Sequence, residues 1–179
     1  MQTQSSRVPA AAAVALVAAL LAGTAVAGSQ RPALRVDDPT QLVESVNTVR
    51  VAHGLVPLRP SSALEQAAVA HSRAMLKQGV FAHRLPDGTS FVQRIRRYYP
   101  ASGFTSWRAA ENILSSGKPL VPDRAVALWL GSPPHRQVLL DPQLREVGIG
   151  AVFTKAAPGD FRGRRAWVVT LDAGARSRS

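Results

Sequence analysis

Hydrophobic residues along the chain follow first a helical and then a strand pattern. Before Pro142, apolar side chains recur every three to four residues in several segments, which predicts α-helices. The predicted helices cover approximately residues 39–53, 63–78, 91–99, 122–130 and 133–140. After Pro142, apolar and polar positions alternate in segments 146–155 and 165–173, which predicts two strands. Pro158-Gly159-Asp160 lies between these strands, so we expect an antiparallel hairpin with a long loop.

The first 27 residues differ in composition from the rest of the chain. Arg7 is their only charged residue, residues 10–22 are apolar, and Ala25-Val26-Ala27 is typical of a cleavage site, so residues 1–27 are predicted to be a secretory signal peptide. The uncharged stretch 8–30 is long enough to span a bilayer, and an uncleaved membrane anchor is therefore the alternative.

The remaining sequence is long enough for one domain with a core of its own. We expect residues 28–37 to be a flexible lead-in, residues 38–173 to fold, and residues 174–179 to form a disordered tail. The chain contains no cysteine, which excludes disulfides, thiolate metal sites and a thiol nucleophile.

Basic residues outnumber acidic ones, 22 to 11, which gives the 179-residue chain a net charge of +11. Aromatic and basic residues do not interleave as in nucleic-acid grooves, so we expect no nucleic-acid partner. An acidic cell-envelope polymer or a lipid is the expected partner, and contact with a membrane is expected only through the N-terminal segment if it is not cleaved. Arg94, Arg96 and Arg97 are spread around the third predicted helix, which is typical of a solvated face; a site for an acidic polymer is the alternative.

Three polar residues are candidates for chemistry. His83 follows Phe81 at strand spacing, so burial of Phe81 would orient the imidazole. Glu111 lies in an apolar segment, where a carboxylate is costly unless it is paired, metal-bound or exposed. His135 lies in the first turn of a short predicted helix, where the helix dipole favours the neutral ring, although packing or capping would also explain it. His71 falls on an apolar helix face and is predicted to be structural.

Several separated motifs together resemble the CAP superfamily, also called the SCP-like or allergen V5 family, in a short cysteine-free bacterial form. The motifs are Asn47 and Arg50 before Gly54-Leu-x-Pro57-Leu58, His71-Ser72-x-x-Met75 with Phe81-x-His83, Asp87-Gly88, Ala110-Glu111-Asn112-Ile113, Trp129-x-x-Ser132-x-x-His135-Arg136, and Val147-Gly148-Ile149-Gly150 before Trp167-Val-Val-Thr170. The resemblance covers about residues 40–173 and rests on the order and spacing of these motifs.

The resemblance implies an α+β fold, a three-layer α-β-α sandwich with a small antiparallel sheet between helices. It also implies that His83, Glu111 and His135 line one central cleft, which in the family holds two histidines and two acidic residues. The family's second glutamate precedes the stretch that contains the second histidine. Residues 114–130 contain no glutamate, and their only acid is Asp123, so the resemblance supports three of the four positions.

These three residues suggest a function for the cleft. Two imidazoles and a carboxylate can fill three positions on zinc or a similar divalent ion, leaving one for a water nucleophile. The family consists mostly of secreted binding or signalling modules, some of which bind sterols or other lipids, with no general enzymatic activity established. We therefore expect a secreted, non-enzymatic module whose cleft of His83, Glu111 and His135 binds a divalent metal, with a cell-envelope or lipid ligand. The alternative is a metal-assisted hydrolase that acts on extracellular or envelope material.

Overall fold

The structure is a computed structural model that describes residues 38–178. The predicted signal peptide (1–27) and lead-in (28–37) lie outside the described residues. Between residues 38 and 178, no helix has both the length and the apolar character needed to cross a membrane.

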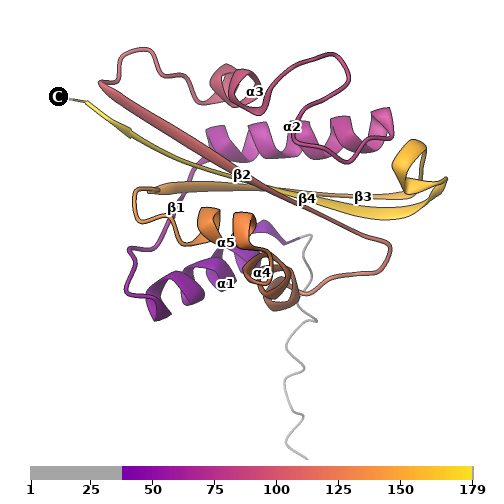
Figure 1. Ribbon diagram of the computed structural model, residues 1–179, viewed down its shortest axis with the longest axis horizontal. Coiled ribbons are helices and arrows are strands. Elements are labelled where there is room, and N and C mark those ends of the chain that lie inside the picture. The colour runs from indigo at the N-terminus through magenta and orange to yellow at the C-terminus, as the bar shows by residue number, and fades with distance from the viewer. Residues whose placement is uncertain (1–37, 179) are drawn as a thin grey trace, which may run out of the picture. The chain divides into compact units, whose positions relative to one another are not determined.

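The described residues form three layers, with helices on both faces of a four-stranded sheet (Figure 1). The strands are β1 (Arg59–Pro60), β2 (Ser106–Ser116), β3 (Glu146–Ala157) and β4 (Arg164–Ser177). Their order in the sheet is β1-β3-β4-β2, and β4 pairs antiparallel with both β3 and β2. The short β1 pairs parallel with β3, so the sheet is mixed where an antiparallel one was expected. The α+β three-layer sandwich is confirmed.

The helices divide between the two faces of the sheet. One face carries α2 (Ser62–Gln78) and α3 (Phe91–Tyr98). The other face carries α1 (Pro39–Ala52), α4 (Pro122–Leu130) and α5 (Pro133–Leu139), as Figure 1 shows. The helix starts follow from local sequence, since the Asp38 carboxylate accepts hydrogen bonds from two backbone N–H groups at the beginning of α1.

Apolar side chains fill the space on both sides of the sheet. The larger core lies between the sheet and α1, α4 and α5, with Trp129, Leu139 and Leu171 buried in it. The core on the other face contains Met75 of α2 and Val168 of β4. Polar side chains in the middle of the sheet are therefore removed from water unless they lie at an edge.

The helix α2 lies unusually close to β3, and two glycines allow this approach. A Cβ atom on Gly148 would lie 1.9 Å from the backbone nitrogen of Glu65, and one on Gly150 would lie 2.2 Å from the carbonyl carbon of Ala68. Neither contact is sterically possible, so both positions require glycine. This close packing fixes the height of α2, and of its His71, above the sheet.

The structure differs from the sequence-based expectation at β2 and at the C-terminal end of β4. The sequence did not predict β2, because Glu111, Asn112 and Ile113 are buried consecutively, and a strand that is buried on both faces shows no polar–apolar alternation. The predicted disordered tail is also wrong, because β4 continues to Ser177. The Arg176 guanidinium stacks 3.7 Å from the centre of the Tyr99 ring, a long-range contact that anchors this polar end of the strand.

Candidate functional site

Glu111 lies in the middle of β2, which is an edge strand of the sheet. Its carboxylate is directed toward the face covered by α2 and α3, where the side chain is 1% exposed. Successive side chains of a strand point to opposite faces. Asn112 accordingly reaches the other face, where its amide donates a hydrogen bond of 2.9 Å to the backbone carbonyl of His135 on α5.

Three basic side chains surround the Glu111 carboxylate. The Nδ1 atom of His83 lies 2.8 Å from Oε1, and the guanidinium of Arg94 donates to Oε2. The Nε2 atom of His71 lies 3.7 Å from Oε1. Because a carboxylate can only accept, Nδ1 of His83 carries the proton in the hydrogen bond to Glu111. The side chain of His83 is 50% exposed, so this ring connects the buried cluster to solvent.

Arg94 holds the cluster together. It is 5% exposed, which contradicts the solvated position predicted for it, because its charge is paired with Glu111 from the neighbouring strand. A second donation of 3.2 Å, from Arg94 to the backbone carbonyl of His83, fixes the loop that carries this histidine. Arg94 therefore positions both members of the His83–Glu111 pair.

The charges of this cluster are set by burial and by mutual contact. Burial raises the pKa of Glu111, but the hydrogen bond from His83 and the charge of Arg94 outweigh it, so the net pKa lies below its usual value. Burial lowers the pKa of His71 to about 4, and the negative charge of Glu111 opposes this only in part. At neutral pH, His71 is therefore uncharged and Glu111 is ionised.

The sequence analysis did not single out Asp172, which the structure places next to Glu111. The two residues are direct neighbours across the β2–β4 pair. Asp172 is completely buried, and neither of its carboxyl oxygens makes a hydrogen bond within residues 38–178. Burial, followed by the charge of Glu111, raises its pKa well above the usual range. The sequence did contain a signal for Asp172, because it is an acid next to the apolar residues of the predicted strand 165–173. An acid among apolar residues is also the feature that identified Glu111.

His135 belongs to α5, which covers the face of β2 opposite the Glu111 carboxylate, and its backbone carbonyl accepts the hydrogen bond from Asn112. It is partly buried in the first turn of α5, as predicted. Burial, and then the charge of His83, lower its pKa, which favours the neutral ring. In the described part of the chain, the bases within 4 Å of the Glu111 carboxylate are His71, His83 and Arg94, and His135 is not among them. The structure thus brings His83 into contact with Glu111 and leaves His135 outside this contact.

The arrangement of these side chains bears on metal binding. Over residues 38–178, no three His, Asp or Glu side chains are grouped so that they could hold a metal ion. Both oxygens of Glu111 already accept hydrogen bonds, and the Arg94 guanidinium would repel a divalent cation. In this arrangement the residues do not fit a three-ligand zinc site. Metal binding by His83, Glu111 and His135 therefore stays a prediction.

Comparisons with known proteins agree with the fold and identify the family. The model of the cysteine-rich secretory protein family, CAP, matches residues 43–171. The uncharacterized protein YkwD of Bacillus subtilis (strain 168) is 30% identical over 112 residues, which cover 63% of this chain and 41% of YkwD. The chain thus matches about two fifths of the length of this curated relative.

Two solved structures share the fold. An outer surface protein from Borrelia burgdorferi superposes with a TM-score of 0.55 at 24% identity, covering 77% of this chain and 90% of that protein. An extracellular protein containing an SCP domain from Bacillus anthracis superposes with a TM-score of 0.56 at 24% identity, covering 81% and 41%. On the match to residues 43–171, this chain belongs to the CAP family, and it does so without a single cysteine.

Proposed function

We propose that this protein is a secreted, non-enzymatic CAP module that binds an acidic component of the cell envelope. The observation that carries the non-enzymatic part is the state of Glu111. Its carboxylate is buried, its oxygens accept from Arg94 and His83, and its pKa lies below the usual value. A general base needs a free carboxylate with a pKa near the working pH, and Glu111 meets neither condition.

The envelope partner is supported by charge and by relatives. The net charge of +11 attracts anionic surfaces at long range. Two structural relatives are described as an outer surface protein and as an extracellular protein. The predicted signal peptide supports the same location for this chain.

Sedimentation with purified envelope fractions tests this proposal. Residues 28–179 should sediment with the envelope at low salt and be released at about 1 M salt, where the Debye length falls to about 3 Å. The supernatant should contain no newly released envelope fragments, and Glu111→Gln should leave this unchanged. Absent binding, binding that resists salt, or fragment release that Glu111→Gln abolishes would each contradict the proposal.

The second candidate is a metal-assisted hydrolase acting on extracellular or envelope material, and the two imidazoles favour it. His83 uses Nδ1 toward Glu111, which leaves its Nε2 for another ligand. His135 has a lowered pKa and therefore favours the neutral form that binds metals. If zinc is held by His83 and His135, Glu111 would orient His83 from behind, as carboxylates commonly do for ligating histidines. Bound zinc would supply an activated water molecule.

A zinc titration followed by native mass spectrometry separates the two candidates. The hydrolase requires one zinc per chain, lost in both His83→Ala and His135→Ala. A folded protein that stays metal-free when zinc is added would exclude it. Zinc bound equally well by both variants would place the ion elsewhere and would also contradict it.

A further inference from the structure

Five basic side chains gather at the end of the sheet where β3 turns into β4. They line two adjoining hollows of about 300 and 710 Å³, which share Ser116, Gly117 and two of the arginines. We call this set the basic hairpin surface; its members are Lys118, Lys155, Arg162, Arg164 and Arg165. None of them belongs to the His83–Glu111 cluster.

The five cations lack anionic partners. All are exposed, and within residues 38–178 none of their side chains makes an ion pair or a hydrogen bond. In the same part of the chain, Arg59, Arg94 and Arg108 pair with acids. Arg73, Arg97 and Arg124 are also exposed without an ion pair there, but they do not line a common hollow. The acid that lines the smaller hollow, Asp160, has one carboxylate oxygen 2.9 Å from the Phe81 backbone N–H, which donates to it. Gathering like charges in this way costs folding free energy through repulsion, and an anionic ligand would relieve it.

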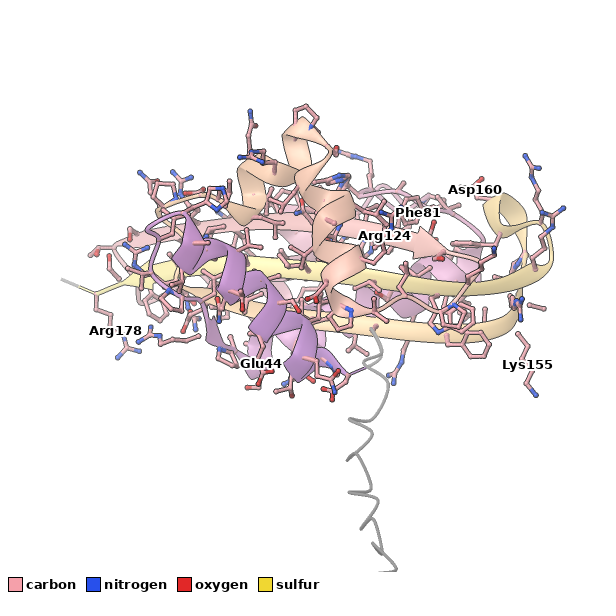
Figure 2. The ribbon with its side chains drawn as sticks, turned by 90° about the horizontal axis from the view of Figure 1, so that it is seen from below. Glu44, Phe81, Arg124, Lys155, Asp160 and Arg178 are labelled. Atoms are coloured by element: carbon pink, nitrogen blue, oxygen red, sulfur yellow. The ribbon has the colours of Figure 1, made fainter. Side chains whose placement is uncertain are left out.

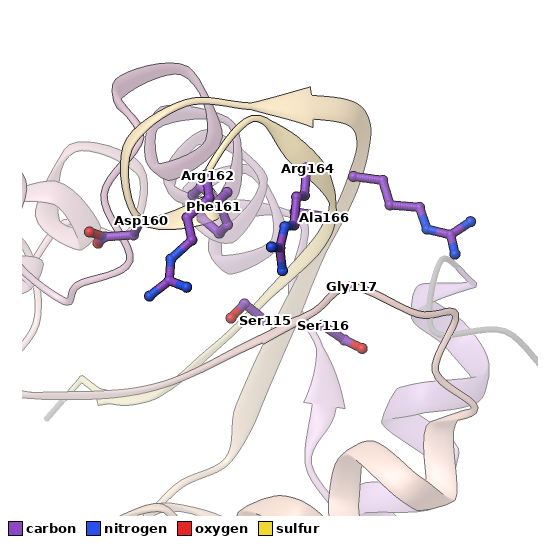
Figure 3. A pocket seen from close by; sticks show the side chains of 9 residues that line it. Ser115, Ser116, Gly117, Asp160, Phe161, Arg162, Arg164 and Ala166 are labelled. Carbon is purple, nitrogen blue, oxygen red and sulfur yellow. The ribbon is translucent and has the colours of Figure 1, made fainter.

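The backbone beneath these side chains is well held. In the β3–β4 loop, Asp160 donates its N–H to the carbonyl of Gly79, and Gly163 donates to that of Ala157. Figure 3 shows the guanidinium groups of Arg162 and Arg164 directed toward the segment that carries Ser115 and Ser116, with the Asp160 carboxylate pointing away. Figure 2 shows Lys155 projecting from this same end of the domain. The backbone therefore fixes the positions from which Arg162, Arg164 and Arg165 extend around the hollows.

We propose that the basic hairpin surface binds an extended, phosphate-bearing polymer. The proposal rests on the envelope binding proposed above and assigns it to a surface and a ligand chemistry. Three of the five cations are arginines, whose planar guanidinium matches two phosphate oxygens at once. Two adjoining hollows suit a chain that passes from one to the other.

The test uses long-chain inorganic polyphosphate as the probe, with binding measured by calorimetry at several salt concentrations. The variant Lys155→Gln/Arg164→Gln/Arg165→Gln should bind about 100-fold more weakly than the wild type, because each basic residue at an anionic surface contributes a factor of about five. The slope of log affinity against log salt concentration should also become shallower by about two, because each of the three lost phosphate contacts contributes about 0.7 to the slope.

The matched control neutralises three exposed arginines on three different helices, Arg73→Gln/Arg97→Gln/Arg124→Gln. It has the same net charge as the test variant and should bind within about twofold of the wild type. Equal losses in the two variants would show that net charge alone drives binding and would overturn the proposal. Thermal unfolding should confirm that both variants fold like the wild type.

Two further arms separate the possible failures. The first arm uses vesicles of phosphatidylglycerol. If the wild type binds these vesicles through the basic hairpin surface but does not bind polyphosphate, the ligand is a membrane surface, and the proposal of a polymer ligand is overturned. Envelope sedimentation that the test variant retains in full would overturn the assignment of this surface and leave the envelope function standing. If the wild type binds polyphosphate through this surface but does not sediment with the envelope, the proposed envelope function is contradicted. The assignment of a phosphate-binding surface would still hold.

Discussion

Replacing His71 with leucine tests how burial sets the charges around Glu111. His71 is completely buried on α2, with its Nε2 3.7 Å from Oε1 of Glu111. Its pKa falls from 6.5 to about 4, chiefly because burial disfavours the charged ring. This difference of about 2.5 corresponds to about 3 kcal/mol, at about 1.4 kcal/mol for each pKa unit.

The sign of the effect follows from which state binds the proton. Below pH 6.5 the unfolded chain protonates this histidine, while the folded chain does so only near pH 4. Stability is therefore lost as pH falls from 6.5 to 4, by about 3 kcal/mol from His71 alone. Asp172 acts in the opposite direction, because its raised pKa lets the folded state take up a proton first, so its contribution grows as pH falls.

Urea unfolding between pH 7 and pH 4 measures this directly. The free energy of unfolding of the wild type should fall by about 3 kcal/mol more than that of His71→Leu, because the other groups are common to both proteins. Asp172→Asn should show a steeper fall than the wild type, since the opposing group is gone. Identical pH profiles for the wild type and His71→Leu would refute the claim that folding keeps His71 uncharged.

Further predictions concern the supports of the site. Arg94→Leu should lower the free energy of unfolding in urea by about 4 kcal/mol, because it leaves the Glu111 charge buried without its partner. Adding Glu111→Gln should recover at least about 1 kcal/mol of this loss. Costs of the two substitutions that simply add would contradict an energetic coupling between Arg94 and Glu111. Gly150→Ala should cost about 3 kcal/mol, because its Cβ meets the α2 backbone at 2.2 Å, and a neutral result would contradict the close packing. Asp160→Ala should cost about 1 kcal/mol and speed hydrogen exchange at the Phe81 amide; unchanged exchange would contradict the contact.

Much of the fold could be predicted from local patterns. The β3–β4 hairpin follows from alternation, and the starts of α1 and α3 follow from Asp38 and from Ser90, which forms a capping box with Gln93. Strand β2 could not be predicted in this way, because its buried middle lies against both cores. The end of β4 depends on the stacking of Arg176 on an aromatic ring far away in sequence, which alternation does not encode.

The candidate site was predictable only in part. The resemblance and the apolar surroundings of Glu111 identified the His83–Glu111 pair, which the structure brings into contact. Arg94 could not be recognised as buried, because its burial depends on a carboxylate 17 residues away that only the fold brings close. The His135 ring stays more than 4 Å from the Glu111 carboxylate, and the spacing of the motifs does not reveal this distance.

The central claim is that the buried Glu111 carboxylate has its negative charge paired with Arg94 and accepts hydrogen bonds from Arg94 and from Nδ1 of His83. Nitrogen-15 NMR of the histidine rings at neutral pH, with and without added zinc, tests it most directly. The account predicts a protonated Nδ1 in His83, with a downfield proton resonance that Glu111→Gln shifts upfield and that zinc does not remove. A His83 ring with an unprotonated Nδ1, or one whose Nδ1 loses its proton to zinc, would contradict it.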